Sequence, residues 1–197
     1  MNKYQIIYAD PPWAYPESGS NAKVHGKHYQ MMTIEEICNL EVNQIANQNC
    51  ALFLWVTMPR LLDGIKCLES WGFTYKTVAF VWIKANKRCT DNKIFDPFMG
   101  AGSWTRSNAE LCLLGFKGKM RRSSASVRQV VYTPLEQHSK KPDIVKDKIV
   151  ELMGDLPRIE LFARQKTDGW DVWGNEVESD VDLEAIQQAK QNIGEIK

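Results

Sequence analysis

The sequence has no long apolar run, no paired-cysteine motif and no leader-like N-terminus. The longest apolar runs, 51–56 and 77–83, fall short of the roughly 18–20 residues that cross a bilayer, so we expect no membrane span. The N-terminus lacks the basic stretch and apolar stretch of a signal peptide. The five cysteines are odd in number and scattered, and the three histidines lack the spacing of a zinc set. These absences argue against a disulfide framework, predict no metal and favour a reducing cytoplasm.

The net charge is close to zero but unevenly spread. The chain has 197 residues, enough for one domain, with 44% apolar and 25% charged residues, which excludes a disordered or fibrous protein. Residues 176–197 carry six acids and two bases, whereas residues 84–128 carry ten bases and three acids. Segment 117–128 holds five of these bases and no acid. Such a patch indicates a polyanionic partner at one face, and a solvated loop is the alternative.

Strand-like and helix-like segments alternate along the chain. We expect strands over 4–9, 50–56, 76–83, 108–115, 129–133 and 158–163, and helices over 34–46, 59–71 and 142–153. The first helix should open with a capping box, with Thr33 as N-cap and Glu36 three residues later. The alternation predicts an α/β fold, a parallel sheet with helices on both faces. We expect one domain over 1–176, followed by an acidic polar helix or tail over 177–197.

The sharpest chemical feature is Asp10-Pro11-Pro12-Trp13, which follows the first buried strand. Ligands of parallel sheets bind at the carboxyl ends of the strands. An exocyclic amine of a nucleobase is a poor nucleophile, because its lone pair is delocalised into the ring. Hydrogen-bond acceptors on both N–H groups would free that lone pair; Asp10 can supply one and the Pro11 carbonyl the other. Pro12 or Trp13 can stack on an extruded base, although Trp13 could instead be a core residue after a proline turn.

Several further motifs share one family resemblance. They are 28–32, 51–57, 80–84, 104–113, 138–143, 158–164 and 169–176. Together with Asp10–Trp13 they cover residues 4–176 in family order. The sequence resembles the MT-A type adenine-N6 methyltransferases, named after the seventy-kilodalton subunit of the messenger-RNA enzyme. It is most similar to their small single-domain branch in bacteria and phages. The resemblance implies a Rossmann-like methyltransferase fold with a mostly parallel central sheet and permuted motif order.

The resemblance also implies roles for particular residues. It makes Asp10, Pro11, Pro12 and Trp13 the catalytic tetrad. It assigns the donor, S-adenosylmethionine, to Asp10, Lys141, Glu160, Arg164, Asn175 and Glu176. Lys141 would meet the donor's carboxylate, and the ribose hydroxyls suit Asn175 and Glu176. On the acceptor side it implies a closing-loop aromatic at Tyr29 and contacts from Trp104, Arg106, Asn108 and Glu110. Arg106 and the basic residues Lys119, Arg121 and Arg122 are candidates for phosphate contacts.

One segment is open to two interpretations. Residues 95–103 resemble the Asp-Pro-Phe-x-Gly-x-Gly turn that binds S-adenosylmethionine in the wider class of permuted DNA amino-methyltransferases. That turn should follow an apolar strand and open a helix, whereas residues 86–93 are mostly polar and a strand follows. We therefore favour an active-site loop near the nucleic acid.

The residues and the resemblance lead to one functional expectation. We expect methylation of the N6 amine of adenine by direct in-line transfer, in DNA, with RNA as the first alternative. Methylation of cytosine at its amine is a lesser alternative. A catalytically silent nucleic-acid-binding subunit is the alternative from another class. We expect a nucleic-acid partner, no membrane, and a homodimer or partner subunit as a possible assembly.

Overall fold

The computed structural model describes residues 3–14, 31–87, 96–102, 104–136, 140–183 and 185. Seven strands of this part of the chain form one sheet in the order β5-β3-β4-β2-β1-β6-β7. Their bounds are β1 Tyr4–Ala9, β2 Ala46–Val56, β3 Thr74–Ala85, β4 Ala109–Lys117, β5 Val130–Pro134, β6 Arg158–Leu161 and β7 Asp171–Trp173. Only the pairs β2–β4 and β3–β4 are antiparallel. The predicted mostly parallel sheet is confirmed, with β4 as the one reversed strand among those described.

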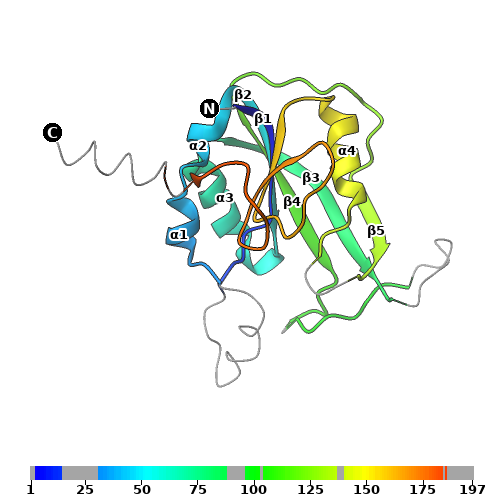
Figure 1. The fold of residues 1–197 in the computed structure, drawn as a ribbon. Helices are drawn as coiled ribbons and strands as arrows, with labels where there is room; N and C mark the ends of the chain where they lie inside the picture. Colours follow the sequence, from blue (N-terminus) through cyan, green and yellow to red (C-terminus); the bar gives the residue numbers. More distant parts are fainter. Residues whose placement is uncertain are drawn as a thin grey trace.

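Helices cover both faces of the sheet (Figure 1). One face carries α1 (Ile34–Cys38), α2 (Val42–Ile45), the 3₁₀ turn η2 (Met58–Arg60) and α3 (Leu61–Ser70), and the other carries α4 (Ile144–Met153). The central strand β2 is buried on both sides: Leu52 and Leu54 pack toward α3, while Phe53 and Trp55 pack toward α4. This explains its continuous apolar run, which is typical of strands in doubly covered sheets. No helix of the described residues is long and apolar enough to span a membrane.

Alternation along the strands places the chemically interesting side chains on the α4 face. Successive side chains of a strand point to opposite faces. Tyr8 belongs to the core cluster under α4, so Asp10, two residues later, continues on that face. By the same count, Glu110 shares the face of Cys112. The α4 face at the carboxyl ends of the strands is therefore where these side chains meet.

Two expectations about the elements were wrong. The helix expected over 34–46 is two short helices, α1 and α2, because Asn39 ends the first and β2 already begins at Ala46. Its capping box is present: the Glu36 N–H donates to Thr33 Oγ1 at 3.2 Å, and Glu36 Oε2 accepts from the Thr33 N–H at 2.7 Å. The short strand β7 was not expected at all. It is three residues long and joins the sheet by parallel pairing with β6.

The chain beyond residue 176 still contributes to the core. Asp180 pairs with β7, since the N–H of Val172 donates to its carboxylate at 2.9 Å and its own N–H donates to the Val172 carbonyl at 2.8 Å. Leu183 is fully buried in the cluster beneath α1 and α3. The packed structure thus extends past the expected domain boundary. Most of the helix or tail expected over 177–197 lies outside the described residues.

The direction of the strands separates two edges of the sheet. All strands except β4 run the same way, so six carboxyl ends and the start of β4 share one edge. The opposite edge holds the end of β4 and the segment 118–129 that leads into β5. In Figure 1 this segment crosses the top of the molecule, and residues 96–102 and 104–108 lie at the bottom.

Candidate active site at the carboxyl edge

The turn after β1 is fixed by backbone hydrogen bonds. Pro11 and Pro12 lack a backbone N–H and end the strand ladder. The N–H of Trp13 donates to the Pro11 carbonyl at 2.9 Å, and the N–H of Met32 donates to the Pro12 carbonyl at 2.9 Å. Asp10 therefore stands at the start of a turn that is tied to a second segment of the chain.

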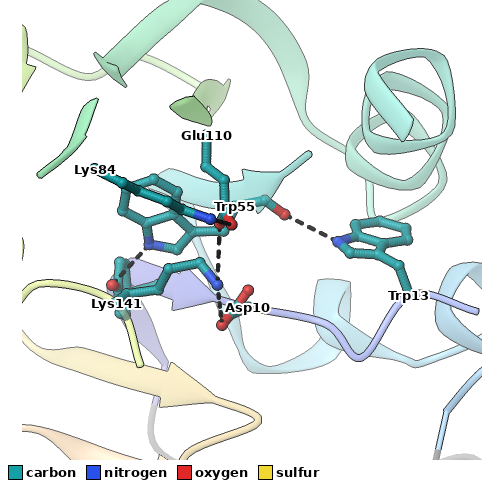
Figure 2. A network of polar contacts seen from close by, with 7 residues as sticks. Asp10, Trp13, Trp55, Lys84, Glu110 and Lys141 are labelled. Carbon is teal, nitrogen blue, oxygen red and sulfur yellow. Dashed lines mark hydrogen bonds and ion pairs between the residues drawn. The ribbon is translucent and has the colours of Figure 1, made fainter. Parts of the chain in front are cut away.

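Trp13 anchors this turn in the core. Its ring is 7% exposed and packs on the α1–α3 side of the sheet, and its N–H donates to the Trp55 carbonyl at 3.1 Å. Figure 2 shows the ring turned away from Asp10. In this position Trp13 is a core residue, which is the alternative that the sequence also allowed. Of the two residues named for stacking, Pro12 is the more exposed.

Asp10 is the end of a chain of alternating charges (Figure 2). Lys141 Nζ lies 2.7 Å from Asp10 Oδ2 and 3.3 Å from Glu110 Oε2. The other oxygen of Glu110, Oε1, lies 2.5 Å from Lys84 Nζ. The four groups come from the end of β1, the start of β4, the end of β3 and the segment before α4. Sequence reasoning named three of them, and the structure brings these three together.

Aromatic rings wall the network on the sheet side. Lys141 Nζ lies 5.8 Å from the centroid of the Trp55 ring, and Lys84 Nζ lies 5.1 Å from that of Trp82. Trp55 is held in turn by its ring N–H, which donates to Tyr8 Oη at 2.7 Å. The side chains of Lys141 and Glu110 are only 9% and 13% exposed. Charges in such a place interact far more strongly than on a surface.

Burial and neighbouring charges set the protonation of these groups. Burial raises the pKa of Asp10 above its ordinary value, although Lys141 opposes the rise. Burial would also raise the pKa of Glu110, but Lys141 and Lys84 together lower it below the ordinary value. Burial would lower the pKa of Lys141, but Asp10 and Glu110 raise it instead. Lys141 and Glu110 are therefore ionised at neutral pH, whereas burial favours the neutral form of Asp10.

A cavity of about 190 Å³ opens beside Asp10 at the ends of β1, β6 and β7. Asp10, Lys141, Glu160, Phe162, Arg164 and Glu176 are among the residues that line it. Five of these six are residues that the family resemblance assigned to the donor. The sixth, Phe162, has a positive φ of 62°, which is uncommon for a side chain of this size and is found most often at functional sites.

Ion pairs organise the walls of this cavity. Glu160 Oε2 lies 2.5 Å from Lys146 Nζ, and Arg164 Nε lies 3.2 Å from Glu176 Oε1. Burial raises the pKa of Glu160, and Lys146 opposes this. Asn175 is exposed in the turn after β7, beside the lining residue Glu176. Glu160 therefore does not simply face solvent, because it is largely buried and pairs with Lys146 of α4.

Other expected substrate residues lie along the same edge. Trp104 is 99% exposed, and Arg106 is exposed beside it on the segment that leads into β4. The carbonyl of Asn108 accepts from the N–H of Lys84 at 2.8 Å, which ties this segment to β3. Tyr29 lies outside the described residues.

The described part of segment 95–103, residues 96–102, has the form of a loop. The N–H of Phe98 donates to the Lys84 carbonyl at 2.7 Å, so the segment runs beside the end of β3 and opens no helix in its described part. Its glycines are needed for its own packing: a Cβ on Gly100 would collide with the Ser107 carbonyl oxygen. None of residues 96–102 lines the cavity beside Asp10. The loop interpretation fits this geometry, and the donor-binding turn does not.

The basic segment lies at the other edge of the sheet. Lys119, Arg121 and Arg122 are exposed on the connection from β4 to β5. Its backbone is held there, since the N–H of Lys119 donates to Asn49 Oδ1 at 2.8 Å and the N–H of Ser123 donates to the Leu152 carbonyl at 2.7 Å. The structure therefore does not bring these residues together with Asp10.

Sequence reasoning missed three residues of the site. Lys84 and Lys146 are the partners of Glu110 and Glu160, and Tyr8 supports Trp55 beneath the network. A signal existed for Lys84, because a lysine that closes an apolar strand at the carboxyl edge needs a partner. Lys146 gave none, since its 7% exposure follows from the docking of α4 and not from its neighbours in sequence.

The sheet order, the helices on both faces and the site at the carboxyl edge define a Rossmann-like α/β methyltransferase. The chain belongs to the MT-A70 family, whose family model matches residues 4–176. These are the residues over which the sequence motifs resemble that family, and the prediction of a methyltransferase is confirmed.

Three relatives show the range of the similarity. The Type II methyltransferase M.MunI of Mycoplasma sp. is 38% identical over 194 residues, which cover 89% of this chain and 78% of that protein. A putative N(6)-adenosine-methyltransferase MT-A70-like protein of Medicago truncatula is 29% identical over 90% of this chain. The N(6)-adenosine-methyltransferase catalytic subunit METTL3 of Homo sapiens is 27% identical over 90% of it. The chain spans 27% and 29% of the lengths of the latter two.

Proposed function

We propose that this methyltransferase transfers the methyl group of S-adenosylmethionine to the N6 amine of adenine in DNA. The observation that carries the proposal is the position of the Asp10 carboxylate. It lies on a fixed turn at the carboxyl edge, between a charge network and a cavity lined by both acids and bases. An acceptor beside a donor pocket is what transfer to an amine requires.

The turn after β1 offers acceptors to both N–H groups of an adenine amine. The carboxylate of Asp10 accepts one. The carbonyl of Pro11 accepts the other with its remaining lone pair, since its first is used by the N–H of Trp13. These two bonds draw the nitrogen toward a tetrahedral shape and free its lone pair. After transfer the nitrogen carries one proton too many, and the Asp10 carboxylate lies where it can take that proton.

The cavity beside Asp10 has the chemistry that the donor needs. S-adenosylmethionine, when bound, supplies a methyl group on a sulfonium whose sulfur departs as a neutral thioether. Lys141 and Arg164 are cations for the donor's carboxylate, and Glu160 and Glu176 are acceptors for its ammonium or ribose hydroxyls. Phe162 offers an apolar surface at the same wall. By holding both reactants at one edge of a rigid sheet, the chain contributes through proximity and orientation.

DNA is favoured over RNA by the pattern of similarity. The bacterial Type II methyltransferase is 38% identical and has 78% of its length covered, whereas the proteins named for adenosine methylation are 27–29% identical with less than a third covered. RNA is the second candidate, because those proteins keep the similarity along 90% or more of this chain. A catalytically silent subunit is disfavoured, because the Asp10 turn and the donor-side ion pairs are both intact.

The test is transfer of a labelled methyl group from S-adenosylmethionine to matched single- and double-stranded DNA and RNA oligonucleotides. Product nucleosides are identified by mass spectrometry, and donor binding is measured in parallel by calorimetry. We expect N6-methyldeoxyadenosine, with less label in RNA. Label in N6-methyladenosine alone would replace DNA by RNA, and label in N4-methyldeoxycytidine would overturn the assignment of the base. If the chain forms no product and binds no donor, the catalytically silent subunit becomes the remaining interpretation.

A further inference from the structure

Two cysteines meet on the face of the sheet opposite α4. Cys38 is the last residue of α1, and Cys67 lies in α3. All four cysteines of the described residues are free thiols, and their spacing in the sequence gave no reason to pair any of them. The proposed methyl transfer uses neither Cys38 nor Cys67, because both lie at the core cluster under α1 and α3 and neither lines the cavity beside Asp10.

The packing of α1 on α3 brings these two thiols together (Figure 1). Trp71 lies one helical turn after Cys67 and therefore shares its face of α3; its backbone N–H donates to the Cys67 carbonyl at 3.0 Å. The ring N–H of Trp71 donates to the carbonyl of Ile37, the residue before Cys38, at 2.9 Å. This bond fixes the end of α1 against the face of α3 that carries Cys67. The two thiols form a hydrogen bond with each other.

The two thiols differ in access and in acidity. Cys67 is fully buried, whereas Cys38 is half-buried, so a small solute in water reaches Cys38 first. The hydrogen bond with Cys67 lowers the pKa of Cys38 to about 6, although burial opposes this. Ser70 and Lys66 of α3 lower it further, and the charge of Glu35 on α1 raises it. Burial raises the pKa of Cys67. A thiolate at Cys38 therefore lies beside a neutral thiol at neutral pH.

We propose that Cys38 and Cys67 form a site of reversible thiol oxidation, in which a hydroperoxide converts them to a disulfide bond that joins α1 to α3. The Cys38 sulfur attacks one oxygen of hydrogen peroxide, the O–O bond breaks, and the leaving hydroxide takes up a proton and departs as water. The Cys67 sulfur then attacks the sulfur of the Cys38 sulfenic acid, and the hydroxyl of that acid leaves with the Cys67 proton as a second water. The two sulfurs are oxidised, and the peroxide is reduced.

The other buried cysteines show why this pair is distinct. Cys50 and Cys112 are fully buried, and burial raises the pKa of both thiols, which makes them unreactive. A thiol that senses oxidants combines partial exposure, a low pKa and a second thiol that resolves its sulfenic acid. Cys38 has all three, with Cys67 as the resolving thiol. The inference goes beyond methyl transfer and stands whether or not the chain methylates adenine.

The test treats the folded, full-length protein with hydrogen peroxide and maps its cysteines by mass spectrometry. Cleavage after lysine, arginine and glutamate places Cys38, Cys50 and Cys67 on separate peptides. We expect a linked pair of peptides that joins Cys38 to Cys67 and that dithiothreitol separates. The proposal would be overturned if Cys38 stayed reduced, joined another cysteine, or went on to sulfinic acid without a bond to Cys67.

Variants separate the attacking thiol from the resolving one. Cys67→Ala removes the resolving thiol, and Cys50→Ala is the matched control, another fully buried cysteine. In Cys67→Ala the Cys38 sulfenic acid should persist, so its capture by dimedone should exceed that in the parent about tenfold or more. Cys50→Ala should form the Cys38–Cys67 bond as the parent does. Equal capture in Cys67→Ala and in the parent would reject the pairing.

A further variant serves if Cys67→Ala does not fold. Cys38→Ala changes the half-buried position, and its Cys67 should stay reduced in peroxide because the oxidant does not reach it. Oxidation of Cys67 in this variant, at the rate seen in the parent, would reject Cys38 as the thiol that is attacked first.

Thermal denaturation tests whether the bond fits the packing of α1 on α3. The crosslinked protein should melt about 4–8 °C above the reduced protein, since a closed loop lowers the entropy of the unfolded chain. Cys38→Ala treated in the same way should gain no stability. A Tm that stays unchanged or falls in the crosslinked protein would overturn the proposal, because the bond would then form only by distorting the two helices.

Discussion

Two groups of basic residues, at opposite edges of the sheet, behave in opposite ways. At the carboxyl edge, Lys84 and Lys141 are largely buried, and each lies within 3.3 Å of a carboxylate. At the other edge, Arg121 and Arg122 are exposed on a loop. The sequence makes the second group conspicuous and the first nearly invisible. The number of charges in a segment thus says little about its distance from the chemistry, whereas burial against a carboxylate says much.

The physical difference between the groups is the cost of removing a partner. A buried ammonium compensates the desolvation of the carboxylates around it, and its loss leaves them unpaired. Replacing an exposed arginine costs the protein little stability, because water already solvates the side chain. The exposed group acts instead at longer range, on polyanions, and its effect should be screened by salt.

The largest effect within this comparison is expected for Lys141→Met. Asp10 and Glu110 would face each other without their shared cation, so unfolding in urea should show a loss of about 2–4 kcal/mol. Turnover should fall by a factor of about 100 or more, since the carboxylate of the donor loses the Lys141 ammonium as its partner. The matched control is Lys140→Met, whose partners Glu136 and Asp143 are exposed, and it should change stability by less than about 1 kcal/mol. Equal stability of the two variants would contradict the buried network.

A smaller effect is expected for Trp13→Phe, which separates anchoring from stacking. The variant keeps an aromatic ring and loses the hydrogen bond to the Trp55 carbonyl, so stability should fall by about 1–2 kcal/mol. Turnover of the folded enzyme should stay within about threefold. Trp13→Leu, which has no ring, should lose more stability but similarly little turnover. A higher KM for the acceptor in Trp13→Leu, without a loss of stability, would show that the ring stacks on the base after all.

The smallest effect on turnover is expected at the opposite edge. The double variant Arg121→Gln/Arg122→Gln should leave kcat/KM for an acceptor of one helical turn within about twofold of the parent. Its affinity for long non-specific duplex should decrease, and the slope of log K against log salt should become shallower by about 2. Lys66→Gln on α3 serves as the control for an exposed cation elsewhere. A tenfold loss on the short acceptor would contradict the separation of the two edges.

Sequence and structure agree where a local pattern decides the outcome. Strand β1 and the Asp10 turn were predicted because an apolar run meets two prolines, and β2 because a doubly buried strand is continuously apolar. The site residues Asp10, Glu110 and Lys141 came from motifs. Their meeting needs the reversal of β4, which no periodicity reveals, since pairing direction is decided by contacts distant in sequence.

What the sequence left open has the same origin. Segment 117–128 was expected to contact a polyanion because of its charge, and its position at the far edge follows from the reversed β4, which ends there. Trp13 was expected either to stack on a base or to lie in the core, and the carbonyl of Trp55, 42 residues later, takes its N–H. Residue 39 ended a helix that the apolar pattern would have continued.

The central claim is that Asp10 activates the acceptor and is not required to hold the donor. The most direct measurement compares Asp10→Ala with the parent in methyl transfer at saturating substrates and in donor binding by calorimetry. The account predicts a loss of turnover of about 1,000-fold or more with donor affinity within about tenfold. Retained turnover in a folded Asp10→Ala variant would contradict it.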